Sequence, residues 1–162
     1  IPITLGGGIR TLECADFLFG IGADKVTLNW SLLNNPDLVK QIAYKYGRQS
    51  VVASIDYRNK DGNYEARVRL SDDKYEFIDV SEMLHKLPFD NIGEFLLTSI
   101  DQDGTGQGLD TDIVHKFKTL KRPIILAGGA GKASHLADAL AQEDINISKM
   151  SIVEIAEIIR LA

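Results

Sequence analysis

Five short apolar runs alternate with helical patterns along this chain, and this alternation limits the folds that the chain can adopt. Each run ends in glycine or polar residues, and the runs lie at 1–5, 24–29, 50–56, 94–99 and 123–127. Apolar strands that alternate with helices predict a parallel sheet buried on both faces. We therefore expect an α/β fold, and we predict one domain because no linker or change in composition divides residues 1–162.

The segments between these strands carry helix signals. The expected helices span 12–22, 34–47, 80–87, 110–120, 132–142 and 151–162. In the second of them, Asn35 is a typical N-cap, Pro36 suits the first helical position and Gly47 suits the end. From Tyr57 to Leu70 the residues instead alternate about a turn in "NKDGN", which predicts a small hairpin.

Glycine and polar residues gather where the predicted strands end. The stretches are "GGGI", Asn29, Asp56, "SIDQDGTGQG" and "GGAG". In parallel α/β folds, ligands bind at the carboxyl ends of the strands. Glycine lets a backbone approach a ligand closely, and the first turn of a helix can hold an anion. Two such turns, which align when Pro2 is matched with Pro123, favour two anion sites, although either turn by itself could be a purely structural turn. Asp56 by itself could be a helix N-cap or a turn residue.

Composition excludes several other classes of function. The net charge of −5 argues against nucleic acid as a partner, and no apolar run of eighteen residues or signal peptide indicates a membrane or export. The single cysteine, Cys14, fits a reducing cytoplasm, and we expect it to be a buried spacer. His85, His115 and His135 fall in predicted helices away from the strand ends, so we expect neither a metal site nor a cofactor.

Four longer motifs resemble the cyclase subunit of imidazole glycerol phosphate synthase, the HisF family. They are "IPITLGGGIRTLECADFLFGIGADKVTLN", "VVASIDYR", "EFLLTSIDQDGTGQG" and "PIILAGGAGK". The resemblance implies a (βα)8 TIM barrel of two similar half-barrels, with one phosphate-binding turn in each half. It also implies a small-molecule substrate with a phosphate at each end and a cytoplasmic enzyme of histidine biosynthesis.

The resemblance covers only part of the family's pattern. It begins at strand three, so strands three to seven are recognisable, while strands one and two are absent and no eighth strand is evident in 142–150. We therefore expect a single partial TIM-barrel domain over 1–162 whose first and last strands are apolar edges. Asp56 occupies the place of the family's catalytic aspartate, but its partner on strand one is missing. Because the acid–base cycle needs both carboxylates, we expect the chain as written to be inactive.

The resemblance also implies substrate contacts and an ammonia entrance. Phosphate and substrate contacts fall on Gly7, Gly8, Asn29, Thr98, Ser99, Asp103, Gly104, Gly128 and Gly129. Of these, strand position places Thr98 and Ser99 toward the pocket, although ordinary packing explains either residue equally well. Asp103 would order a loop or hold a ribose hydroxyl. Lys25 and Glu94 begin their strands, where the family places a charged gate facing a glutaminase subunit of the HisH type. A surface salt bridge is the competing interpretation.

Two departures keep alternative functions open. Trp30 stands where the family has a small residue, and the segment 69–83 lacks the family's glycine-bearing turn. These departures resemble paralogues that pass ammonia to a separate enzyme, which amidates a bacterial surface sugar. A non-catalytic phosphate-binding fragment is a third hypothesis. The isomerase of the same pathway, also a two-phosphate barrel, fits "LLTSIDQDGT" and "GGAGK" less well.

Overall fold

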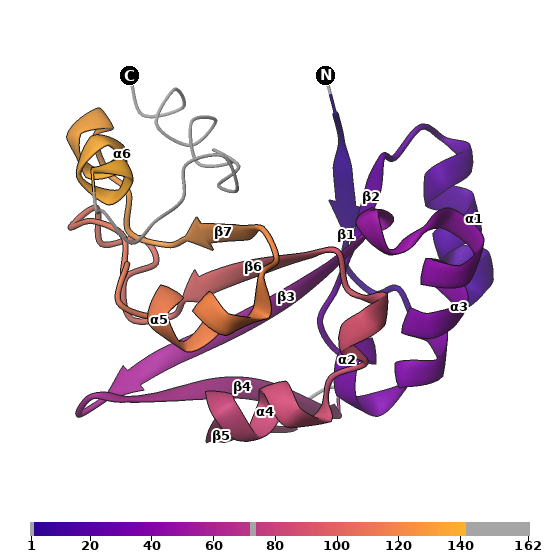
Figure 1. Ribbon diagram of the computed structural model, residues 1–162, viewed down its shortest axis with the longest axis horizontal. Helices are drawn as coiled ribbons and strands as arrows, with labels where there is room; N and C mark the ends of the chain where they lie inside the picture. The colour runs from indigo at the N-terminus through magenta and orange to yellow at the C-terminus, as the bar shows by residue number, and fades with distance from the viewer. Residues whose placement is uncertain (1, 72–73, 142–162) are drawn as a thin grey trace.

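Five parallel strands form a curled sheet in the order β1, β2, β3, β6, β7. The computed structural model describes residues 2–71 and 74–141, and these strands span Thr4–Gly6, Lys25–Leu28, Val51–Lys60, Glu94–Ser99 and Ile124–Ala127. Figure 1 shows the sheet turning steadily from β1 to β7. The expected α/β fold is confirmed, and its curl is consistent with part of a (βα)8 barrel. Within the described residues, β1 and β7 are the two edges of this parallel sheet.

The hairpin after β3 is larger than the sequence predicts. β3 continues past Asp56 to Lys60, pairs with antiparallel β4 (Asn63–Ser71), and β4 pairs in turn with β5 (Lys74–Asp79). Gly62 forms the first turn with a φ of +86°, as its predicted place in the turn requires. The strand β5 was not expected, because five of the eight residues from 72 to 79 are charged. Asp56 therefore lies inside a long strand rather than at its end.

Helices follow the strands in the predicted order. They are α1 (Leu12–Gly20), α2 (Ser31–Asn34), α3 (Pro36–Tyr46), α4 (Val80–Lys86), α5 (Val114–Phe117) and α6 (Ala133–Leu140), with 3₁₀ turns at Arg48–Ser50, Phe89–Asn91 and Lys118–Leu120. The N-cap prediction is confirmed, because the Asn35 side chain accepts a hydrogen bond from the backbone N–H of Leu38 at 3.3 Å. The expected helix at 110–120 is reduced to α5 and a 3₁₀ turn. The helix expected at 151–162 and the segment 142–150 lie outside the described residues.

The outer face of the sheet carries the core. In β3, Ala53, Ile55 and Tyr57 are fully buried, whereas the alternate residues Ser54 and Asp56 are only partly covered. This alternation has the period of two that a strand imposes. Figure 1 shows α1 and α3 together beside β1 and β2, with α4 against the hairpin strands. The inner face of the sheet is thus left for polar side chains.

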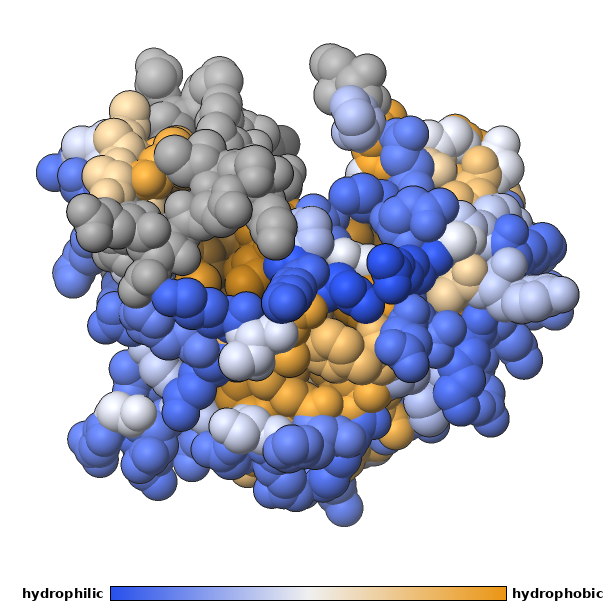
Figure 2. Space-filling view, viewed as in Figure 1, coloured by the Kyte–Doolittle hydropathy of each residue, from blue (hydrophilic) through white to orange (hydrophobic). Residues whose placement is uncertain are grey.

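The surface of α1 corrects one prediction from the sequence. Cys14 is exposed, not buried. Ala15 is the residue of α1 that is fully covered, and Cys14, one position before it, points about 100° away from it around the helix axis. Phe17 is also 65% exposed. On the face of the molecule that Figure 2 shows, apolar residues reach the surface across the middle and hydrophilic residues border them. No helix among the described residues is long and apolar enough to cross a membrane.

Candidate functional site

Asp56 lies on the inner face of the sheet beside Thr98. The two residues are Cα partners in the parallel pairing of β3 with β6, so their side chains share one face. Ser99 faces the other way, where its side chain hydrogen-bonds to that of buried Tyr57. The expectation that Thr98 and Ser99 both face the pocket is therefore wrong for Ser99, because consecutive strand residues point to opposite faces.

A cavity of about 470 Å³ joins Asp56 to the first glycine turn. Gly7 and Gly8 line it with φ angles of +103° and +68°, and a Cβ built on either would meet nothing within 4 Å. The backbone of this turn is thus open to a ligand, as the prediction of an anion site requires. Asn29 also lines the cavity, and its side-chain N–H donates to the Ser54 carbonyl at 3.1 Å. One function of Asn29 is therefore to tie the end of β2 to β3.

The surroundings of Asp56 favour proton transfer. Burial raises the pKa of its carboxyl group, and the nearby Asp103 carboxylate raises it further, while the Arg67 guanidinium opposes both effects. A carboxyl group whose pKa is raised by burial holds a proton more readily near neutral pH and can give it up again. The site therefore combines an open backbone turn with a carboxyl group suited to acid–base work.

Three arginines line the same cavity, and sequence reasoning missed them. Arg67 and Arg69 come from β4, and Arg10 follows the first glycine turn. Two aromatic rings support them, because the Arg67 guanidinium lies 4.0 Å from the ring centre of Tyr75 and that of Arg10 lies 5.3 Å from Trp30. The alternation of charged and apolar residues in "YEARVRL" could have placed both hairpin arginines on one face.

The second glycine turn is closed, in contrast to the first. Gly128 and Gly129 are buried, and a Cβ added to Gly129 would overlap the carbonyl oxygen of Gly108. The loop after β6 packs on this turn, with the Gly108 N–H donating to the Gly129 carbonyl at 2.7 Å. Asp103 and Gly104 lie in the exposed part of that loop. Both turns follow strands of one parallel sheet, so they lie at the same edge as predicted.

The structure corrects the position expected for His135 and shows how the loop after β6 begins at Asp103. His135 was expected away from the strand ends, but it lies in the first turn of α6 and its Nδ1 accepts a hydrogen bond from the Gly131 N–H at 3.2 Å. Its helix follows β7 after only a short glycine loop, which brings it to this edge of the sheet. The Asp103 N–H donates to the Ser99 carbonyl at 3.0 Å, which orders the start of the long loop.

An ion pair marks the opposite, amino-terminal edge of the sheet. Lys25 and Glu94 begin β2 and β6, which pair with β3, and the Lys25 Nζ lies 2.6 Å from the Glu94 Oε2. The Glu94 side chain is 8% exposed and that of Lys25 is 34% exposed. The expected proximity of these two residues is confirmed, and the buried carboxylate makes the pair more than a surface salt bridge.

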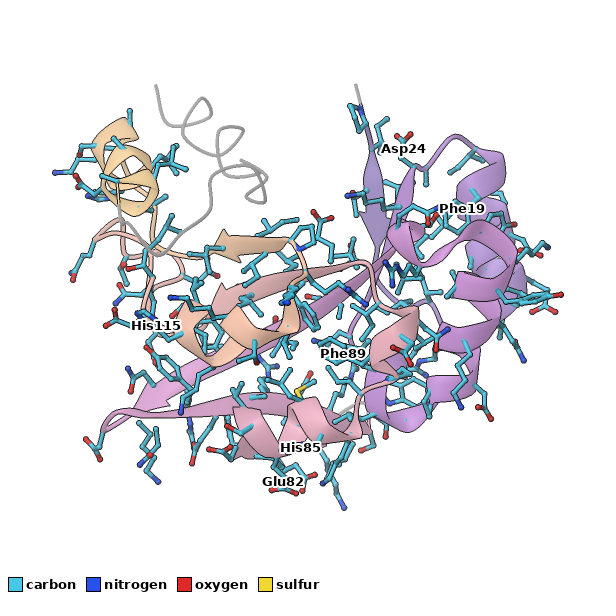
Figure 3. The ribbon with its side chains drawn as sticks, in the orientation of Figure 1. Phe19, Asp24, Glu82, His85, Phe89 and His115 are labelled. Carbon is cyan, nitrogen blue, oxygen red and sulfur yellow. The ribbon has the colours of Figure 1, made fainter. Side chains whose placement is uncertain are left out.

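The remaining histidines lie outside the site. His85 and His115 are both exposed, on α4 and α5, and Figure 3 shows His85 and Glu82 at the outer side of α4. Across residues 2–71 and 74–141, no three His, Cys, Asp or Glu side chains come together as metal ligands would. The described part of the cavity lining offers a carboxyl group, guanidinium groups and an open glycine turn.

Known proteins share this pattern over most of the chain. The family model for histidine biosynthesis proteins matches residues 1–152. A protein named imidazole glycerol phosphate synthase subunit hisF2 from Parasynechococcus marenigrum is 43% identical, over 88% of this chain and 53% of its own length. The HisF subunits of Chlorobium limicola and Pelodictyon phaeoclathratiforme are 40% and 39% identical, and the matches cover 57% and 67% of their lengths.

The chain spans between about half and two thirds of the length of these curated relatives. Its matched region contains the open glycine turn, Asp56 and the Lys25–Glu94 pair. The chain belongs to the histidine biosynthesis protein family, among the HisF subunits of imidazole glycerol phosphate synthase.

Proposed function

We propose that the complete polypeptide carrying these residues is the cyclase subunit of imidazole glycerol phosphate synthase, a cytoplasmic lyase. It would use ammonia to convert a bis-phosphorylated ribulosyl aminoimidazole carboxamide nucleotide into imidazole glycerol phosphate and an aminoimidazole carboxamide ribonucleotide. The observation that carries the proposal is the position of Asp56 in one cavity with the open turn at Gly7 and Gly8. The names of the relatives support the same reaction.

Asp56 is the proposed proton carrier of this reaction. Ammonia attack on a carbonyl carbon, loss of water, and ring closure with cleavage of the C–N bond that releases the aminoimidazole carboxamide ribonucleotide each need a proton to be added or removed. Burial raises the pKa of the Asp56 carboxyl group above its ordinary value, which makes this group a better proton donor and acceptor for such steps. Thr98, its neighbour on the inner face, would orient the substrate. The second carboxylate implied by the resemblance would complete the cycle, and inactivity of residues 1–162 alone stays a prediction.

The two glycine turns are the proposed phosphate sites. At the first turn, the backbone at Gly7 and Gly8 faces the cavity directly, with Asn29 beside it. At the second, Gly128 and Gly129 are covered by the loop after β6, so Asp103 and Gly104 at the exposed part of that loop would complete the site.

Ammonia is proposed to enter at the Lys25–Glu94 pair from a HisH-type glutaminase bound at the amino-terminal edge. An ion pair with a buried carboxylate can close an opening until the lysine moves, and Lys25 is the more exposed partner. In the assembled enzyme, Lys25→Met would then reduce glutamine-dependent turnover more than turnover with ammonium salt.

Turnover with ammonium salt tests the cyclase proposal. The complete polypeptide should convert the ribulosyl nucleotide without glutaminase, and Asp56→Asn should lower kcat by about 10²-fold or more. Asp61→Asn is the matched control, since Asp61 lies in the exposed hairpin turn and should leave the rate unchanged. Turnover that survives Asp56→Asn would remove Asp56 from the mechanism.

One further observation favours a second candidate function. Trp30 and the hairpin arginines line the cavity and alter the surface that a substrate would meet. They suit a HisF-like paralogue that passes ammonia to a separate amidating enzyme acting on a bacterial surface sugar. That candidate predicts no turnover of the ribulosyl nucleotide, together with stimulation of a glutaminase partner. A phosphate-binding fragment without catalysis predicts neither turnover of the ribulosyl nucleotide nor stimulation of a glutaminase.

A further inference from the structure

The inner wall of the cavity alternates arginine and aromatic side chains. We call Arg10, Trp30, Arg67, Arg69 and Tyr75 the arginine wall, and all five line the 470 Å³ cavity. Arg67 and Arg69 are two residues apart on β4, so they project from the same face of the hairpin. Arg69 and Tyr75 are Cα partners across β4 and β5, which fixes the ring beside both guanidinium groups.

Stacking on aromatic rings orients these arginines, and Arg69 also donates a hydrogen bond from its Nε to the Ser71 carbonyl at 3.3 Å. The guanidinium carbons of Arg67 and Arg69 lie 4.0 Å and 5.8 Å from the centre of the Tyr75 ring, and that of Arg10 lies 5.3 Å from Trp30. A guanidinium group has five N–H donors, so one that is stacked on a ring and already has a partner can still donate to a ligand in its plane. Such a group loses less side-chain entropy on binding than a free one.

The charges of the lining specify the class of ligand. The described lining carries three arginines and one carboxylate, Asp56, although the whole chain has a net charge of −5. Burial favours the protonated form of that carboxylate by raising its pKa. Gly7 and Gly8 of the open turn line the same space. A dianionic, tetrahedral group matches several guanidinium forks better than a planar monoanion does.

We propose that the arginine wall binds the phosphate monoester seated on the first glycine turn and thereby selects a phosphorylated substrate. Trp30 then supports Arg10 and does not merely narrow the phosphate site. The proposal rests on the proposed function only in taking the first turn as a phosphate site. It makes Arg67 and Arg69 specificity-determining residues supplied by the hairpin.

Calorimetric titration of the complete polypeptide with glycerol phosphate tests the wall. Arg67→Gln and Arg69→Gln should each weaken binding about ten- to hundredfold, as expected for a lost charge-assisted hydrogen bond. Arg67→Lys should recover part of that loss, since it keeps the charge but not the planar fork. Glycerol acetate, a neutral analogue, should bind at least a hundredfold more weakly than glycerol phosphate.

Arg58→Gln is the matched control, because Arg58 belongs to the same hairpin and its removal changes the net charge equally. Arg58 is paired with Glu65 at 2.6 Å and is not part of the cavity lining. Its substitution should change binding less than twofold, and circular dichroism should show all variants folded. Equal losses for Arg58→Gln and Arg67→Gln, or no loss for Arg67→Gln and Arg69→Gln, would overturn the proposal.

The same titration separates this proposal from the cyclase proposal. Turnover of the ribulosyl nucleotide with unchanged phosphate affinity in the arginine variants overturns the wall alone. Phosphate binding that depends on the wall, in a protein without turnover, supports the wall and overturns the cyclase. Inorganic phosphate serves as a second probe, and it should bind more weakly than glycerol phosphate if the wall reads a monoester.

Discussion

The Lys25–Glu94 pair should contribute to stability asymmetrically. Glu94 has a side chain only 8% exposed, so Lys25→Met would leave a carboxylate buried without its partner. Loss of one member of a buried pair costs about 3–5 kcal/mol, and water can reach this site beside the partly exposed lysine. We therefore expect Lys25→Met to lower the free energy of unfolding by about 3 kcal/mol. Glu94→Leu leaves a lysine that is 34% exposed and can be solvated, so it should cost about 1 kcal/mol.

A double-mutant cycle measured by urea denaturation checks this asymmetry. The double variant Lys25→Met/Glu94→Leu replaces the pair by apolar groups, which is often close to neutral, so it should lie within about 1 kcal/mol of the wild type. The coupling energy should then exceed about 2 kcal/mol. Additive effects of the two single substitutions would refute this reasoning and would make the pair equivalent to a surface salt bridge, worth about 0–1 kcal/mol.

Other substitutions test other parts of the site and the core. Asp56→Asn should raise the free energy of unfolding by about 0.5–2 kcal/mol at pH 7. Because folding raises the pKa of Asp56, this gain should fade as the pH falls toward about 4, which urea denaturation at several pH values would detect. Gly129→Ala should lower the free energy of unfolding by about 3 kcal/mol, because of the positive φ and the overlap with Gly108. Gly7→Ala adds only backbone strain and should lower it by about 1–2 kcal/mol in the same measurement. Phe95→Ala should cost about 3–5 kcal/mol by thermal denaturation, since its ring is fully buried.

The parallel sheet could be predicted because its local signals agree with each other. Apolar runs such as 94–99 are too short for helices, and each is followed by glycine or polar residues. Asn35 and Pro36 fix a helix start by their own geometry, which depends on few distant contacts. The pairing of Lys25 with Glu94 was accessible as well, since parallel strands place their first residues at one edge.

The hairpin could only be predicted in part, because pairing across it decides its extent. Tyr75 and Phe77 alternate with charged residues, and this pattern becomes a strand only when β4 lies beside it. The position of Arg67 and Arg69 beside the cavity depends on how β4 pairs with its neighbouring strands, and the sequence alone does not give that register. Ser99 shows the reverse case, because the period of two could have assigned it to the face away from Asp56, yet we expected Thr98 and Ser99 on the same face.

The two glycine turns show why a repeated motif does not predict a repeated environment. Both turns have left-handed glycines and follow parallel strands, so the shared sequence predicts the shared backbone. The loop after β6 is long, and its residue Gly108 bonds to Gly129, whereas β2 is followed almost directly by α2 and leaves Gly7 open. Under the proposal that both turns hold phosphate, anion affinity at the second turn would come partly from that loop, while at the first turn it would come from the turn itself and from the arginine wall. The chemical difference between the two halves is thus set by the segments that follow the neighbouring strands, and not by the turns that the halves have in common.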